Sequence, residues 1–226
     1  GYPIGGFWLL PTDGLFQSDE EVQKYNKDGV LILPNAKAGD IKFRDTNDDG
    51  KINDDDRIYK GSPFPSFTMG LNLSAQWRGF DMMMGLQGNF GNKIYNATKA
   101  FLENTTSGIN YLATTYDYWT PQNTDATYPR LTWNDPNRNL RPESDRNLED
   151  GSYVRLRNVQ IGYTVPKIIK GLNKCRIYIS MENLFTITKY SGYTPDVNTG
   201  NSMSRGMDNF TYPLYRTFML GLNVGI

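Results

Sequence analysis

Residues 66–90 alternate strictly between apolar and polar positions on two successive arms. The apolar parity of the first arm carries Phe67, Met69, Leu71, Leu73, Ala75 and Trp77. The apolar parity of the second arm carries Phe80, Met82, Met84, Leu86 and Phe90. A side-chain period of two predicts strands, and the short Arg78-Gly79 connection predicts that the two strands form a hairpin.

Aromatic residues stand at both ends of the apolar face on each arm of this hairpin. Strands of about 10 residues that alternate in this way between aromatic ends are typical of a transmembrane β-barrel. A soluble antiparallel β-sandwich alternates in the same way. The hairpin alone therefore leaves both folds open.

Three later segments repeat the alternation and are predicted as strands at 153–165, 175–185 and 215–226. In the first of them, the apolar residues before Asn158 have the opposite parity to those after it. This change of parity predicts either a β-bulge near Asn158 or a membrane edge at that point. Earlier in the chain, Ser18 and Glu21 fit a capping box, which predicts a short helix.

The connections between the predicted strands differ in length in a regular way. Long polar segments cover about 1–65, 91–152 and 190–213, whereas 78–79 and 166–174 are short. Outer-membrane barrels combine long outer loops with short periplasmic turns. The sequence therefore predicts an all-β fold, made of carboxy-terminal antiparallel strands of a large transmembrane β-barrel with long extracellular loops. Too few strands are present to close such a barrel, so the earlier strands are expected to precede Gly1.

Composition narrows the possible functions. The 226 residues include 24 basic and 24 acidic side chains, so the net charge is zero and nothing favours a nucleic-acid surface. There is no histidine, which excludes His-based catalytic triads, and a single cysteine, which excludes an internal disulfide. No apolar run approaches the ~20 residues of a membrane-spanning helix.

Residues 45–56 match the Ca²⁺-binding loop pattern D-x-[DN]-x-[DN]-G through its sixth position, where Gly50 permits a sharp turn. The twelfth position carries Asp in place of Glu, and no helical pattern flanks the loop. The alternative is a solvated acidic turn, but the spacing favours a structural Ca²⁺ site. Its predicted ligands are Asp45, Asn47, Asp49, the carbonyl of Lys51, and Asp56.

Several segments occur in the order known from one protein family. They include GDIKFRDTNDDGKINDDDR, RGFDMMMGLQGNFG, SYVRLRNVQIGYTVP and YPLYRTFMLGLNVGI. The chain resembles the carboxy-terminal part of SusC/RagA-type TonB-dependent outer-membrane transporters of Bacteroidetes. The resemblance implies a membrane-embedded barrel with an amino-terminal plug outside this segment. It also implies import of oligosaccharides or peptides, energised through the TonB complex, with a SusD-like surface lipoprotein as a lid.

Three functions are compatible with these features. The leading one is a segment of a nutrient importer without catalytic residues. The alternative is a secreted soluble β-sandwich that binds carbohydrate and carries a calcium loop. An enzyme is not expected, because the spacing of carboxylates such as Glu149, Asp150 and Glu182 singles out no catalytic pair. Exposure of the apolar faces separates the first two, since a sandwich buries the side chains that a barrel presents to lipid.

Aromatic residues in the long polar segments are candidates for contact with sugar rings. Trp119, Trp133 and Tyr193 have ring faces on which a sugar can stack. The competing explanation is that such residues pack their own loops. The sequence does not choose between these roles.

Overall fold

The computed structural model describes residues 1–166, 174–197 and 204–225. The chain forms two compact units. Unit 1 consists of Gly1–Pro63, Tyr95–Leu148 and Asn198–Phe210, and unit 2 consists of Phe64–Ile94, Glu149–Val197 and Thr211–Ile226. Most of the predicted short connection at 166–174 lies outside the described residues.

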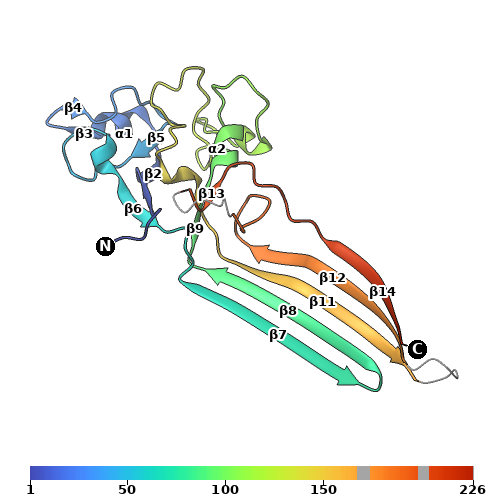
Figure 1. Ribbon diagram of the computed structural model, residues 1–226. Coiled ribbons are helices and arrows are strands. Elements are labelled where there is room, and N and C mark those ends of the chain that lie inside the picture. Colours follow the sequence, from blue (N-terminus) through green and yellow to red (C-terminus); the bar gives the residue numbers. More distant parts are fainter. Residues whose placement is uncertain (167–173, 198–203, 226) are drawn as a thin grey trace. The chain divides into compact units, whose positions relative to one another are not determined.

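Unit 2 contains one five-stranded antiparallel sheet, whose long strands lie side by side in Figure 1. The strand order is β14-β12-β11-β8-β7, so strands that follow one another in this unit pair with one another. The strands are β7 (Phe67–Trp77), β8 (Phe80–Phe90), β11 (Tyr153–Val165), β12 (Lys174–Thr188) and β14 (Thr217–Gly225). All the strands predicted from the alternation are confirmed, with ends shifted by at most three residues.

The hairpin of β7 and β8 has a two-residue turn at Arg78 and Gly79, as predicted. Both residues have positive φ angles, 47° and 88°. A turn with positive φ at both central positions matches the right-handed twist of the strands on either side. The turn pairs Trp77 with Phe80 and sets the register as far as Phe67 and Phe90.

A β-bulge explains the change of parity in β11. Relative to β8, the register shifts between Leu156 and Asn158, which leaves Arg157 as an extra residue. At the same place, β12 contains one residue more than β11 between paired positions. Asn183 lies in this stretch of β12 and has a φ angle of 50°. Of the two explanations offered by the sequence, the bulge is therefore the one observed.

Unit 1 is built from short strands and helices joined by long turns. Its antiparallel pairs are β1 with β6, β2 with β5 and β3 with β4, and residues of β9 pair in parallel with β13. The strands are β1 (Phe7–Leu9), β2 (Thr12–Leu15), β3 (Asn26–Lys27), β4 (Val30–Leu31), β5 (Ile41–Phe43), β6 (Ile58–Gly61) and β13 (Met207–Asp208). Two further strands, β9 (Lys93–Asn96) and β10 (Leu148–Asp150), have residues in both units. The helices are α1 (Asp19–Lys24) and α2 (Ala97–Leu102), with 3₁₀ turns at Asp54–Asp56, Ala113–Tyr116 and Asp145–Asn147.

Helix α1 begins where the capping box predicts. The hydroxyl of Ser18 accepts a hydrogen bond from the N–H of Glu21 at 3.2 Å. The Glu21 carboxylate accepts from the N–H of Gln17 at 2.8 Å, one residue before the expected partner. No helix in the described residues is both long and apolar enough to cross a membrane.

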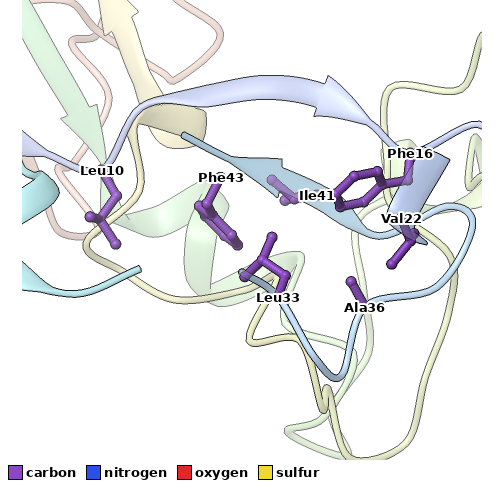
Figure 2. Packing of buried hydrophobic residues seen from close by; sticks show 7 residues of the cluster. All are labelled: Leu10, Phe16, Val22, Leu33, Ala36, Ile41 and Phe43. Carbon is purple, nitrogen blue, oxygen red and sulfur yellow. The ribbon is translucent and has the colours of Figure 1, made fainter. Parts of the chain in front are cut away.

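The hydrophobic core of unit 1 includes side chains of α1 and β5 (Figure 2). The half-buried side chains of Leu15, Tyr25 and Ile52 pack against this core. Ile52 belongs to the acidic loop, so that loop is attached to the core through its one apolar side chain. The buried members of the core are Leu10, Phe16, Val22, Leu33, Ala36, Ile41 and Phe43.

The segment 91–152, which the sequence presents as one long polar loop, has substantial structure of its own. It contains α2 and both Tyr128 and Trp119 are buried. The indole N–H of Trp119 donates to Gln17 at 3.1 Å, across 102 positions of sequence. Packing of this kind has no sequence period, which is why the alternation could not predict it.

Candidate functional site

One face of the sheet in unit 2 is apolar from edge to edge. The register aligns Leu73, Met84 and Val159 in one row, and Ala75, Met82 and Ile161 in the next. The same face continues through Ile179 to Leu220 and through Ile177 to Leu222. Leu220 and Leu222 are 77% and 61% exposed, whereas the side chains near the bulge, such as Val159, are buried by their neighbours. A β-sandwich would bury this face, so its exposure favours a membrane sheet over the soluble alternative.

An ion pair lies on the opposite, polar face. Arg176 on β12 donates from Nε to the Asp81 carboxylate on β8 at 2.8 Å, and from its guanidinium to Gln160 at 3.2 Å. The pair crosses β11 above Gly162. A Cβ atom there would lie 2.5 Å from the guanidinium and 2.7 Å from the carboxylate, so a larger residue would displace both side chains from this arrangement.

The alternation puts Asp81 and Arg176 on the polar parity of their strands, but it does not predict that they pair. A pairing requires the register across three strands, which the sequence does not state directly. The register puts Asp81, Gly162 and Tyr178 in one row and Arg176 opposite Thr164 in the neighbouring row of the same face, so the ion pair is a diagonal contact. A second arginine, Arg155, is held on the same face by Thr186 at 3.0 Å and Asp196 at 3.2 Å.

The predicted calcium ligands lie in unit 1, on a tight turn. Asp45 accepts the N–H of Gly50 at 2.8 Å, and the side-chain oxygen of Asn47 accepts the N–H of Asp49 at 3.0 Å. The Asp49 carboxylate in turn accepts the N–H of Lys51 at 2.9 Å. Gly50 has a φ angle of 82°, so its predicted role in the turn is confirmed.

Asp56 is fully buried at the end of the same loop. Its two oxygens accept the N–H groups of Thr46 at 2.8 Å and Asn53 at 2.9 Å. No ion pair involves Asp56 in the part of the chain that the structure describes. These hydrogen-bond partners are all neutral, and the bond from Asn53 is part of a capping box at the 3₁₀ turn Asp54–Asp56.

The structure thus brings the predicted ligands into one loop without gathering them into one cluster. Among the described residues, no group of three or more His, Cys, Asp or Glu side chains is arranged to hold a metal ion. The carboxylates instead accept N–H groups of their own loop, as an acidic turn does. The calcium site therefore stays a prediction.

Tyr25 connects this loop to the core of unit 1. Its hydroxyl donates to the carbonyl of Phe43 at 2.7 Å and accepts the N–H of Asp45 at 3.0 Å. Burial raises the pKa of Tyr25, which keeps its hydroxyl neutral and able to serve both bonds. The first predicted ligand is in this way fixed to the end of β5.

The chain is similar in sequence to characterised proteins over nearly its whole length. It is 33% identical to the TonB-dependent receptor P3 of Formosa agariphila, over an alignment that covers 99% of this chain and 22% of the relative. It is 29% identical to the TonB-dependent receptor SusC of Bacteroides thetaiotaomicron, over 84% of this chain and 18% of the relative. The chain belongs to the TonB-dependent receptors of the SusC/RagA type. These receptors are outer-membrane proteins, which agrees with the exposed apolar face of the sheet.

Solved structures show the same fold for this segment of a TonB-dependent receptor. The RagAB peptide transporter matches with a TM-score of 0.72 and 21% identity, over 99% of this chain and 23% of that one. Its open-open state matches with a TM-score of 0.70. The chain spans about a fifth of the length of the curated relatives. No family profile matches it. The relatives are named as receptors or transporters and not as enzymes, in keeping with the prediction of no catalytic residues.

Proposed function

We propose that this chain forms part of the wall and loops of an active importer in the outer membrane. The importer takes up oligosaccharides or peptides, draws energy from the TonB complex and works with a SusD-like surface lipoprotein. The observation that carries this proposal is the two-faced sheet of unit 2. One face is apolar and exposed as lipid contact requires, and the other holds its charges in pairs, as a solvent-filled interior allows.

The side of the membrane on which the loops lie is part of the same proposal. The predicted loops 1–65 and 91–152 supply most of unit 1, while the turn at Arg78 and Gly79 has two residues. Outer-membrane barrels place long loops outside the cell and short turns in the periplasm. Unit 1 is then the part of the chain that substrate and lipoprotein meet first.

Deletion of the gene for the full-length receptor tests the import function. The expected result is loss of growth on at least one oligosaccharide or peptide mixture supplied as sole carbon source, with recovery on complementation. The same loss is expected when the TonB protein is removed, because the barrel itself supplies no energy. Unchanged uptake across a broad panel, or uptake that persists without TonB, would contradict the proposal.

We also propose that the acidic loop of unit 1 binds one structural Ca²⁺ ion. Asp45, Asn47, Asp49, the Lys51 carbonyl and Asp56 would hold it, and the hard oxygen donors suit Ca²⁺. Support comes from the contrast between two fully buried carboxylates of unit 1: Asp40 pairs with an arginine, whereas the hydrogen-bond partners of Asp56 are all neutral. A cation in the loop would give Asp56 its missing counter-charge and would order the loop against Ile52 and the core.

Limited proteolysis of the full-length receptor tests this site. Millimolar Ca²⁺ should slow cleavage within 45–56, since extracellular modules bind with Kd of about 10⁻⁴–10⁻³ M. The double substitution Asp45→Asn/Asp49→Asn should abolish the protection. Asp55→Asn serves as the matched control, because it removes an exposed carboxylate of the same loop outside the ligand positions. Equal cleavage of wild type with Ca²⁺ and with chelator would show that the loop is only an acidic turn.

A further inference from the structure

A cavity of about 770 Å³ lies in unit 1 between residues 105 and 133. Four of its ten lining residues are aromatic: Tyr111, Tyr116, Tyr118 and Trp133. The others are Thr, Asn, Ile and Leu, so the lining carries no charge. Its volume is within the ~300–1,000 Å³ typical of small-molecule sites.

The aromatic rings of this cavity are available to a ligand. Trp133 is 89% exposed and Tyr116 is 83% exposed. In the described part of the chain, neither the Trp133 indole N–H nor the Tyr116 hydroxyl has a hydrogen-bond partner. Trp119, in contrast, is 8% exposed and bonded to Gln17. Of the two tryptophans that the sequence analysis named as candidates for sugar contact, Trp119 therefore packs its own loop, whereas Trp133 is exposed to solvent.

The acidic residues that flank the cavity are engaged elsewhere. Asp117, next to Tyr116, accepts from the Asn123 side chain at 3.1 Å and from the N–H of Thr127 at 3.1 Å. These bonds lower the pKa of Asp117, which keeps it ionised within its own turn. Asp135 accepts the N–H groups of Asn139 and Leu140 at 2.7 and 2.9 Å. The cavity is therefore neutral because its neighbouring charges are used in local turns.

We propose that this cavity is a binding site for a neutral oligosaccharide. The C–H face of a sugar ring is apolar and slightly positive, which complements the negative face of Trp133 or Tyr116. The sugar hydroxyls find donors and acceptors in the Thr, Asn and Tyr side chains of the lining. A peptide would bring charged ends and side chains into a site that offers no counter-charge, at a cost in desolvation. The inference rests on the proposed import function, since it names the substrate class.

Binding measurements on the purified full-length receptor test this site directly. Wild type and variants are titrated by calorimetry with neutral linear hexasaccharides of glucose, xylose, mannose, galactose and fructose, and separately with a casein digest as the peptide class. At least one hexasaccharide should bind, and Trp133→Ala should weaken it about tenfold or more. Trp133→Phe should retain part of the affinity because it keeps a ring face. Trp8→Ala is the matched control, because Trp8 is an exposed tryptophan of unit 1 outside the cavity.

Each outcome decides the assignment. Equal affinity of the Trp133→Ala and Trp8→Ala variants for the sugar would overturn the site. So would the absence of sugar binding to wild type, or peptide binding that Trp133→Ala abolishes. The growth test of the complemented strain measures import independently of the sugar-binding measurements. It therefore distinguishes a wrong sugar site from a wrong import function. If uptake depends on the receptor and on TonB while Trp133 has no effect on sugar affinity, only the sugar site is wrong.

Discussion

Replacing Asp40 by alanine should destabilise unit 1 by about 3–5 kcal/mol, because it leaves a partly buried arginine without its counter-charge. Asp40 is fully buried, and its carboxylate accepts from Arg130 Nε at 2.7 Å and Nη2 at 2.9 Å. It also accepts from the Asn139 amide at 2.8 Å and the Lys37 N–H at 2.9 Å. Three of these four bonds, those from Arg130 and Asn139, join segments 90 to 99 positions apart, so no local contact replaces them.

Hydrogen exchange on the full-length receptor measures this effect locally, because exchange reports the free energy of opening of each region. Amides around Ile41 and Asn139 should exchange roughly 100-fold faster or more in the Asp40→Ala variant, since about 1.4 kcal/mol corresponds to a factor of ten. Asp13→Ala is the control. Asp13 also forms a two-bond pair with an arginine, Arg44, but that pair is exposed and should contribute only ~0–1 kcal/mol. Similar exchange in both variants would show that the Asp40 network does not hold the unit together.

The sequence predicts the secondary structure of unit 2 better than that of unit 1. The bonds of Asp40 to Arg130 and Asn139 show why. The strands of unit 2 separate two environments, so every second side chain must be apolar and the pattern is visible locally. Unit 1 is held by polar contacts between distant segments. The Ile41 N–H donates to the Asn139 side chain across 98 positions, and Thr12 donates to Asp145 across 133. A local pattern of apolar and polar residues cannot predict contacts between such distant residues.

The candidate sites divide in the same way. The turn of the acidic loop was predictable, because the bonds made by the side chains of Asp45, Asn47 and Asp49 within it span five positions or fewer. The neutrality of the cavity was not, because it depends on Asp117 being held by Thr127 within a turn that the sequence does not mark. The ion pair of Asp81 and Arg176 was predictable only in part. The alternation puts both residues on the polar face, but their contact is diagonal, since Asp81 pairs with Gly162 and Arg176 with Thr164.

Replacing Leu222 by arginine should destabilise the full-length receptor in a bilayer by about 2–4 kcal/mol, the cost of a cation at the midplane of the lipid face. Leu222 lies on the apolar face of β14, opposite Ile177, and is 61% exposed. Leu222→Ala removes the same side chain without adding charge, and should cost much less. Unfolding by denaturant in lipid vesicles gives the comparison. Equal stability of the two variants would mean that this face does not contact lipid.

Further arginine substitutions in β14 show whether the loss of stability depends on the face of the sheet or on the strand as a whole. Met219 is adjacent to Leu220 but points to the polar face, where it pairs with the neutral Ser180, so Met219→Arg should leave the stability nearly unchanged. Along the apolar face the cost should also depend on depth, because it falls to about 0–1 kcal/mol near the membrane interface. Val224 lies closer to the end of β14 than Leu220, so Val224→Arg should be tolerated better than Leu220→Arg. A cost that is the same on both faces and at all three apolar positions would indicate a general effect on folding of β14 and not burial of charge in lipid.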